Sequence, residues 1–444
     1  MKNSYDIVVV GGGPGGIGAA VMAARYGVKT LLVERCGMLG GMAASGEVQP
    51  FMRNHFDPGS SAKKHEGWNW GGHEICMDKP VYQEWTAAML EYLPSQFLNE
   101  QIKDAEAAKS KRRMISKDIA ALAAEDLCLA AGVELLYHHT LINVEVNGNA
   151  IDHLVVSSKS GLSNLYANVY VDCSGDADIA AASGLCEIEM GDEFGNCQPM
   201  TLCFKLSNVD KSKMPSPNEI QSLFDKAKAD GVLTSPRHSL LHFPFYDNDI
   251  IHFNTTRIVG YSGVDGMSLS RAEIEGRRQL REYLLWLRST IPGFENAMLH
   301  SMGQHIGIRE TRRVRGLAYL TREDVLKCAK YDDAIARCNY PIDIHSATSH
   351  DTEIVHIPHT DFYEIPFGCI IPKGVTNLAI GGRPISADVS AHSSFRIMPS
   401  ACSIGQAAGV AAAMSSATKC SLPNLDGVKV RNQLINMGAW LHNI

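Results

Sequence analysis

The sequence predicts an α/β fold: a Rossmann-like domain with a parallel sheet, helices and a small antiparallel sheet, interrupted by an inserted α+β domain. Three observations predict this. The chain opens with a strand, a glycine turn, a helix and a second strand, and it returns to a strand, glycine and helix pattern after residue 366. Between them, short strands mix with a long helix. We therefore predict domain segments at 1–200, 201–365 and 366–444.

Hydrophobic periodicity and the interrupting glycines predict the elements in order. In the first segment we expect strands at 6–10, 30–34, 134–138, 141–147, 151–157 and 165–172, and helices at 15–26, 81–92 and 116–131. Residues 51–105 are otherwise irregular and contain the Trp68/Trp70 pair. In the insertion we expect strands within 201–209, 239–245 and 249–260, and helices at 270–289 and 322–329. The return segment predicts a strand at 377–380 and a helix from near Pro399.

Composition excludes several classes of function. The net charge of −7 and pI of about 6.2 give no electrostatic footprint for nucleic acid. The one dense basic run, KSKRR at 109–113, is short and predicts a solvated helix start. No segment has the roughly 20 apolar residues that cross a bilayer, and the N-terminus lacks the pattern of a signal peptide. The 12 cysteines form no C-x-x-C pair and no metal-binding cluster, so we expect no metal and no redox disulfide.

The glycine turn at the start of the chain predicts a dinucleotide site. Gly11, Gly13 and Gly16 form G-x-G-x-x-G between a strand and a helix, so that backbone N–H groups and the helix N-terminus face a pyrophosphate. Glu34, 18 residues beyond Gly16, ends the second strand, where it can bind ribose hydroxyls. These features suit both a nicotinamide and a flavin dinucleotide.

Three further glycine-marked segments favour the flavin. Gly40-Gly41 follows the ribose acid by six residues, a spacing that lets the chain pass close to an extended FAD. The strand in YVDCSGDAD, 170–178, ends at Asp172 and turns at Gly175. Near the C-terminus, Gly381-Gly382 precedes a helix whose positive N-terminus can stabilise reduced flavin. An extended cofactor is built from such discontinuous segments, whereas a nicotinamide does not need them.

These motifs resemble the FAD-dependent oxidoreductases that share their flavin domain with fumarate reductase and succinate dehydrogenase flavoproteins and with the flavin part of heterodisulfide reductase. The resemblance rests on GGGPGG, VERCGMLGGMAASG, KSGLSNLYANVYVDCSGDADIAAASG, GIRETRRVRGLAYLTREDV, YPIDIH, YEIPFGCIIP and GGRPIS…SFRIMPSACSIGQAAG. It covers most of the chain outside residues 51–105 and 210–300, and the cysteine clusters of heterodisulfide reductase are missing. With the turn residues, it implies an FAD site formed by Gly11, Gly13, Pro14, Gly15, Gly16, Glu34, Arg35, Gly40, Gly41, Met42, Leu141, Ser174, Gly175, Gly382, Arg383 and Ala401.

Candidate catalytic residues are histidines and arginines. Arg309 and Arg312 in GIRETRRVRG share a face if this stretch is helical, and either can clamp a carboxylate or phosphate. The alternative is a salt-bridged surface with Glu310 and Glu323.

His392 and Arg396 resemble the H-G-x-x-R of fumarate-reductase-like enzymes, which holds a dicarboxylate, although the glycine is absent here. For Arg396 the alternative is that it only ties the loop to the flavin domain. His345 follows Asp343 by two residues, so in a strand the acid could hold the imidazole in one tautomer. Each histidine could equally be structural, and Tyr363 is a weaker source of a hydroxyl.

We therefore predict an FAD-dependent oxidoreductase that transfers a hydride between flavin N5 and a small polar substrate, which could carry a carboxylate. Three alternatives remain: a reductase of C=C bonds fed by a donor protein, an electron-relay subunit without a substrate of its own, and a nicotinamide dehydrogenase, which would be colourless. The chain has no second G-x-G-x-x-G, so electrons come from the substrate, from an NAD(P)H bound without that fold, or from a partner protein. We expect a cytoplasmic protein without nucleic-acid or membrane partners; a homo-oligomer is left open.

Overall fold

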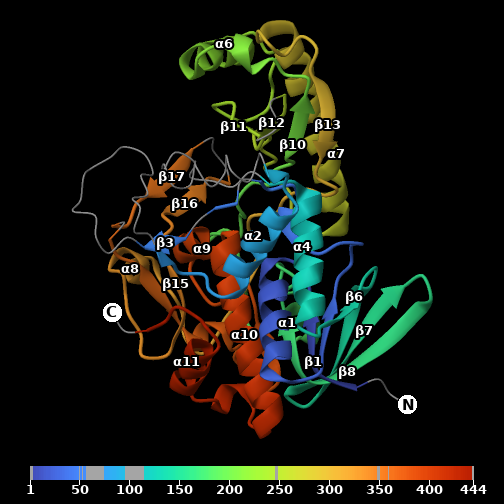
Figure 1. Cartoon of the computed structure of the whole chain (residues 1–444), viewed down its shortest axis with the longest axis vertical. Helices are drawn as coiled ribbons and strands as arrows, with labels where there is room; N and C mark the ends of the chain where they lie inside the picture. The colour runs from blue at the N-terminus through green and yellow to red at the C-terminus, as the bar shows by residue number, and fades with distance from the viewer. Residues whose placement is uncertain are drawn as a thin grey trace.

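The structure is a computed structural model that describes residues 4–49, 51–52, 54–56, 75–95, 115–245, 249–347, 351–358 and 360–442. The expected Trp68/Trp70 pair and the basic run at 109–113 lie outside these residues. Figure 1 shows a main body with a lobe that rises from it, built from β10 to β13, α6 and α7. The predicted α/β fold class is confirmed by a main sheet that is mostly parallel.

The main sheet of the described chain has the order β5-β2-β1-β8-β7-β6, with β19 also paired to β8. β1 pairs in parallel with β2 and β8, and β8 pairs in parallel with β19. Only β7 pairs antiparallel with β6 and β8, which gives the small antiparallel part that the sequence predicted. The strands of this sheet are β1 (Ser4–Val10), β2 (Thr30–Val33), β5 (Glu134–Leu136), β6 (Thr140–Asn147), β7 (Ala150–Ser158), β8 (Gly161–Asp172) and β19 (Leu378–Ile380).

Two helices from opposite ends of the chain pack directly on each other in the middle of the body (Figure 1). These are α1 (Pro14–Tyr26) and α10 (Met398–Thr418). Glycines allow the contact: a Cβ on Gly405 would lie 1.9 Å from the carbonyl oxygen of Gly15, and one on Gly409 would lie 2.1 Å from that of Ala19. The small residues of α10 therefore bring the N-terminus of this helix beside the glycine turn that precedes α1.

The lobe has a hydrophobic core of its own, made by buried residues between Leu202 and Ala297. Its sheet has the order β11-β12-β10-β13, and the long helix α7 packs on it. The elements are β10 (Phe204–Ser207), α6 (Pro217–Ala229), β11 (His242–Pro244), β12 (Ile251–Phe253), α7 (Gly266–Thr290) and β13 (Met298–Met302). Residues between Val314 and Ile357 pack instead into the core of the main body. The boundaries at 201 and 365 stay predictions.

The remaining elements cover the body. They are α2 (Val81–Glu91), α4 (Lys117–Ala130), α5 (Asp178–Ser183), α8 (Arg322–Leu326), α9 (Val389–Phe395), α11 (Gly427–Asn436), β3 (His55–Phe56), β4 (Ile75–Cys76), β9 (Ile188–Met190), β14 (Arg312–Val314), β15 (Ala334–Cys338), β16 (Ile342–His345), β17 (Thr352–Val355), β18 (Tyr363–Pro366) and the short 3₁₀ turns η1 (Gly41–Ala43), η2 (Lys211–Lys213), η3 (Phe367–Ile370) and η4 (Leu422–Asn424). The helix considered for the stretch with Arg309 and Arg312 is wrong, because β14, which begins at Arg312, is a strand that pairs with β9.

No single helix of the described chain is long and apolar enough to cross a membrane. The helices α9 and α10 pass that test only together, across a bend of 98°.

Candidate active site at the junction of two cavities

The four glycine-marked segments meet at one end of the main sheet. A Cβ on Gly11 would lie 2.3 Å from the carbonyl oxygen of Cys173, and one on Gly41 would lie 2.8 Å from Cα of Gly13. On the other side, a Cβ on Gly15 would lie 3.1 Å from Gly382. Segments from the start, middle and end of the chain are therefore in backbone contact, as an extended dinucleotide requires.

These segments line a cavity that contains the predicted cofactor residues except Gly16 and Gly40. It is lined by Gly11, Gly13, Pro14, Gly15, Glu34, Arg35, Gly41, Met42, Leu141, Ser174, Gly175, Gly382, Arg383 and Ala401. Gly16 supports the turn from behind, because a Cβ there would lie 1.7 Å from the carbonyl oxygen of Gly11. The Gly40 N–H donates to the Gly12 carbonyl over 2.8 Å and so ties the second segment to the first.

Glu34 lies in the wall of this cavity and is 8% exposed. Its Oε2 accepts a hydrogen bond from the Gly12 N–H, and its Oε1 accepts one from the Cys36 N–H, both over 2.7 Å. The carboxylate is therefore fixed across the glycine turn at the end of β2. This is where an acid can meet the ribose of a dinucleotide.

The turn after β8 is held by a buried carboxylate. Asp172 accepts hydrogen bonds from Ser174 Oγ over 2.7 Å and from the Ala180 N–H over 3.1 Å. Burial raises the pKa of Asp172 to about 6. One turn later, Asp176 accepts hydrogen bonds from Arg383 over 2.7 Å and from Thr311 Oγ1 over 2.6 Å. Asp176 thus joins the middle and C-terminal segments at the cavity wall.

Comparison with known families decides the identity of the chain. Residues 6–434 match the family described as FAD dependent oxidoreductase. The chain belongs to this family. The cavity of the glycine segments fits the FAD of this family, because segments from the start, middle and end of the chain are in backbone contact around it.

Individual relatives match the flavoprotein over short stretches. A dihydrolipoyl dehydrogenase of Trypanosoma brucei brucei is 64% identical over 39 residues, which are 9% of this chain and 8% of the relative. A digeranylgeranylglycerophospholipid reductase of Thermoplasma acidophilum is 52% identical over 44 residues, 10% of this chain and 11% of the relative. The matches thus span only about a tenth of these relatives. Among solved structures, a geranylgeranyl bacteriochlorophyll reductase-like protein from Thermoplasma acidophilum is 14% identical, with 98% of this chain and 84% of that chain covered and a TM-score of 0.47.

A second cavity, of about 510 Å³, adjoins the FAD cavity. The two share the wall residues Met42, Ile308, Arg383, Arg396 and Met398. Met398 and Ala401 belong to the first turn of α10, so the start of this helix faces the FAD cavity, as predicted. We call the second space the substrate cavity; its walls come from both the body and the lobe.

Arginines dominate the charge of the substrate cavity. Arg237, Arg309, Arg383 and Arg396 line it, whereas Asp343 is its only carboxylate among the described residues. Arg309 donates to the carbonyl oxygen of Pro199 over 2.6 Å and to Thr201 Oγ1. Burial, with Arg396 and Arg237 nearby, lowers the pKa of Arg309 to about 9. Its hydrogen-bond partners are neutral, and Asp343 is the one cavity carboxylate among the described residues that offsets its charge.

The other predicted arginine of this stretch lies elsewhere. Arg312 points away from the substrate cavity and bonds the carbonyl oxygen of Asp176 over 2.9 Å and Asp178 Oδ1 over 3.0 Å. Its expected pairing with Arg309 required a helix, whereas successive residues near a strand point to opposite faces. The alternative expectation is a salt-bridged surface that includes Glu310. Glu310 does form an ion pair, with Arg313 at 2.6 Å, but this pair is buried.

Arg396 and His345 both line the substrate cavity, and Asp343 lies between them. Arg396 Nη2 is 3.7 Å from Asp343 Oδ2, and His345 Nε2 is 3.6 Å from Asp343 Oδ1. His345 Nδ1 lies 3.1 Å from Thr352 Oγ1. Burial and the nearby Arg309, Arg396 and Arg237 lower the pKa of His345 far below the ordinary range, so its imidazole is neutral.

His392 is outside the walls of both cavities. It lies on α9, 1% exposed, with its ring 5.8 Å from that of Phe395. Burial, with Arg313 and Arg396 close by, lowers its pKa well below the usual value. The spacing H-x-x-x-R therefore places only Arg396 at the cavity. Tyr363 is also fully buried and donates to Ser394 Oγ over 2.8 Å.

Sequence reasoning missed several wall residues. Arg237 and Asn254 come from the lobe, and His305 comes from the segment after β13 that crosses the FAD cavity. No motif marks them, because their position follows from how the lobe sits on the body. Asp176 carried a usable signal, since it directly follows Gly175 in the predicted flavin turn.

Proposed function

We propose that this protein catalyses two-electron hydride transfer between FAD and a small polar substrate that carries a carboxylate. The observation that carries the proposal is an arginine-lined cavity that adjoins the FAD cavity and shares five wall residues with it. A volume of about 510 Å³ suits a small organic molecule. Such a cavity also favours an enzyme over an electron-relay subunit, which has no need of one.

The charge of the cavity supports an anionic substrate. Arg383 is paired with Asp176, and Arg396 lies near Asp343. Arg309 has only neutral hydrogen-bond partners, and Arg237 makes no hydrogen bond or ion pair with any residue that the structure describes. Guanidinium groups bind carboxylates through paired, charge-assisted hydrogen bonds. A carboxylate between these two arginines would balance charge that the protein leaves uncompensated.

In this proposal FAD supplies the redox chemistry by accepting or donating a hydride. Arg237 and Arg309 bind the carboxylate, and Arg396, at the boundary of the two cavities, orients the reacting carbon toward the cofactor. His345 is neutral and lies beside the arginines, so it can accept the proton that accompanies oxidation of a hydroxyl or amine. An anion that offsets the arginine charges would make protonation of His345 easier.

The test is an anaerobic screen of the purified holoprotein. Small hydroxy acids, amino acids and unsaturated acids are compared with the corresponding alcohols, amines and alkenes, and bleaching of the flavin absorption is measured. The unsaturated acids are tested with the pre-reduced protein, so the screen also separates a dehydrogenase from a C=C reductase. We expect only acids to react. Reaction with the neutral analogues at equal rates, or with no compound at all, would contradict the proposal.

A further inference from the structure

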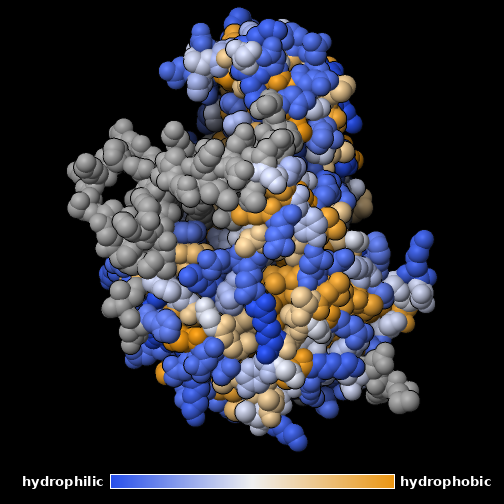
Figure 2. All heavy atoms as spheres, in the orientation of Figure 1, coloured by the Kyte–Doolittle hydropathy of each residue, from blue (hydrophilic) through white to orange (hydrophobic). Residues whose placement is uncertain are grey.

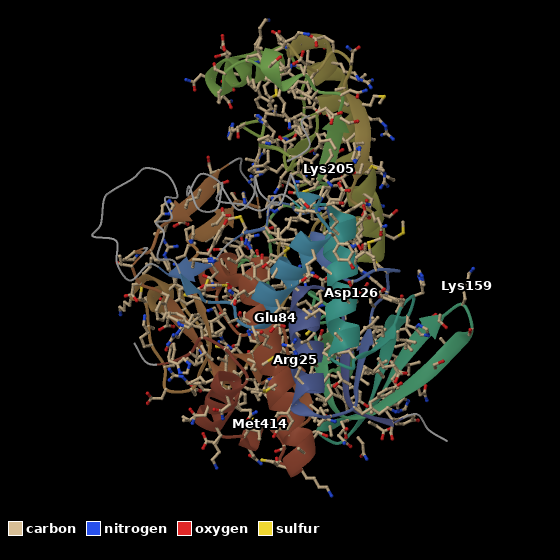
Figure 3. All side chains as sticks on the ribbon, in the orientation of Figure 1. Arg25, Glu84, Asp126, Lys159, Lys205 and Met414 are labelled. Carbon is tan, nitrogen blue, oxygen red and sulfur yellow. The ribbon has the colours of Figure 1, made fainter. Side chains whose placement is uncertain are left out.

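Buried polar side chains lie between the FAD-binding loop after η1 and the sheet of the lobe. Lys205 on β10 is directly opposite His252 on β12 and Ser301 on β13, so the three side chains share one face of the sheet. Their neighbours Phe204 and Phe253 point the other way, into the lobe core. Lys205 lies at the base of the lobe, above α4 (Figure 3). We call Glu47, Lys205, His252 and Ser301 the interlobe cluster.

Glu47 is the charged centre of the interlobe cluster. It is 0% exposed and has a left-handed φ of 52°, which fixes its side chain toward the lobe. Its Oε1 lies 3.9 Å from Lys205 Nζ and 3.7 Å from Lys117 Nζ. Both distances are too long for direct hydrogen bonds. They are long ion pairs, which leave the carboxylate oxygens of Glu47 without a close partner.

The cluster holds many polar atoms without a hydrogen-bond partner among the residues of the structure. These atoms are both carboxylate oxygens of Glu47, both ring nitrogens of His252 and Ser301 Oγ. Buried polar groups are almost always bonded to protein or to ordered water. The unpaired atoms of the interlobe cluster are therefore available to bond water.

The residues next to the interlobe cluster reach from a partly exposed lysine to the substrate cavity. At the outer end, Lys117 is the first residue of α4, and its side chain is 18% exposed. At the inner end, Val48 follows Glu47 directly, and Asn254 lies two residues after His252; both line the substrate cavity. Asn254 Oδ1 is itself buried without a partner. Phe243, opposite His252 across β11 and β12, lines the cavity as well.

We propose that the interlobe cluster is a hydrated proton route, with Glu47 and His252 as its relaying groups, between solvent at Lys117 and the substrate cavity. The proposal rests on the proposed function, because oxidation of a hydroxyl or amine by hydride transfer leaves one proton in the cavity, and the reverse reaction consumes one. Glu47 can accept and release a proton, and a neutral imidazole can accept at one nitrogen and donate at the other.

The charges around the route agree with this assignment. Burial lowers the pKa of Lys205, and burial together with Lys205 lowers the pKa of His252 to about 3, so this imidazole is neutral at physiological pH. The charged or titratable groups that face Glu47 and Lys205 are Lys117, Asp118, Cys203 and His252. His345 can accept the proton only briefly, because the arginines of the cavity oppose its charge. A route onward from the cavity is therefore needed.

The test separates electron transfer from proton transfer without any substrate. Anaerobic holoprotein is mixed with reduced methyl viologen, a one-electron donor that carries no proton. Two viologen cations and one proton are consumed for each FAD reduced to its anionic two-electron form. Viologen absorbance reports the electrons, and phenol red in weakly buffered solution reports the proton. In the wild type we expect the two signals to run together.

Glu47→Gln and His252→Leu are expected to slow proton uptake at least tenfold, and the second electron transfer with it, because the two-electron form of FAD contains the proton. The first electron transfer needs no proton and should keep its rate, and added imidazole should restore the other two signals. Glu91→Gln, an exposed acid on α2, is the matched control and should behave as the wild type. Because Glu47→Gln disturbs a buried ion pair, His252→Leu is decisive if the first variant loses FAD. Wild-type proton uptake in His252→Leu would overturn the proposal. The acid screen is independent, so its failure would overturn the proposed function alone.

Discussion

Substitution of Gly405 by alanine tests whether the contact of α1 with α10 builds the FAD site. The new Cβ would lie 1.9 Å from the carbonyl oxygen and 2.6 Å from the carbonyl carbon of Gly15. Both are backbone atoms that no rotamer change can move, so the helices must separate by about 1 Å. Forced overpacking of this kind typically costs about 1–3 kcal/mol of the free energy of unfolding.

The same displacement moves the cofactor site, because Met398 and Ala401 on α10 and Gly15 on α1 line the FAD cavity. We expect Gly405→Ala to lower the melting temperature by about 2–4 °C for each kcal/mol of unfolding free energy that is lost. We also expect this variant to release FAD on dilution. Flavin absorbance after gel filtration and calorimetry measure the two effects. The control is Gly266→Ala at the start of α7, where no atom lies within 4 Å of the new Cβ. A Gly405→Ala protein that keeps both its FAD and its melting temperature would refute the packing argument.

Three further predictions address the site. Glu34→Ala removes the acceptor of the Gly12 and Cys36 N–H groups. It should raise the Kd of FAD about 10-fold to 100-fold in a fluorescence titration, as expected for hydrogen bonds to a charged group. An unchanged Kd would contradict the role of Glu34. Arg309→Gln should weaken binding of a reactive acid by about tenfold or more without loss of FAD, whereas the exposed Arg281→Gln should not; equal effects would exclude a specific carboxylate contact. The native state should lose stability as the pH falls below about 6.5, because the unfolded chain protonates a histidine that the fold keeps neutral at His392. His392→Gln should remove part of that dependence in urea unfolding and leave turnover unchanged, while His252 and His345, which the fold also keeps neutral, account for the rest; a fall in turnover with FAD retained would instead indicate a catalytic role.

The cofactor site could be predicted from the sequence because its signals are local. A strand, a glycine turn and a helix within a few residues define the dinucleotide turn, and Gly11 shows the left-handed φ of 101° that the turn requires. Gly16 and Gly40 belong to the segments that line the cavity, but they do not line it themselves. They support the backbone behind it. A spacing pattern records that glycine is needed without saying which atom needs the space.

The substrate side could not be predicted in the same way, because its residues meet only after the lobe has packed on the body. Arg237 and Arg309 belong to separate parts of the chain and converge at one cavity. Arg309 and Arg312, three residues apart, diverge because the segment is extended. His392 and Arg396 also have different surroundings, the first inside α9 and the second at the boundary of the cavities. Such outcomes depend on tertiary packing, which a single sequence does not display.

The charged residues at the contact between the lobe and the main body bear on how the reaction is organised. Figure 2 shows the viewed face of the lobe as largely hydrophilic, so the lobe does not present a broad apolar surface there. Its charged contributions turn inward: Arg237 faces the substrate cavity, and Lys205 faces Glu47 on the FAD-binding loop. Met42 and Ser45 of this loop line the FAD cavity, and Glu47 of the same loop contacts Lys205 of the lobe. In the proposed function, a shift of the lobe would move Arg237 and Lys205 together, so that substrate binding at Arg237 would be transmitted through Glu47 to the FAD-binding loop.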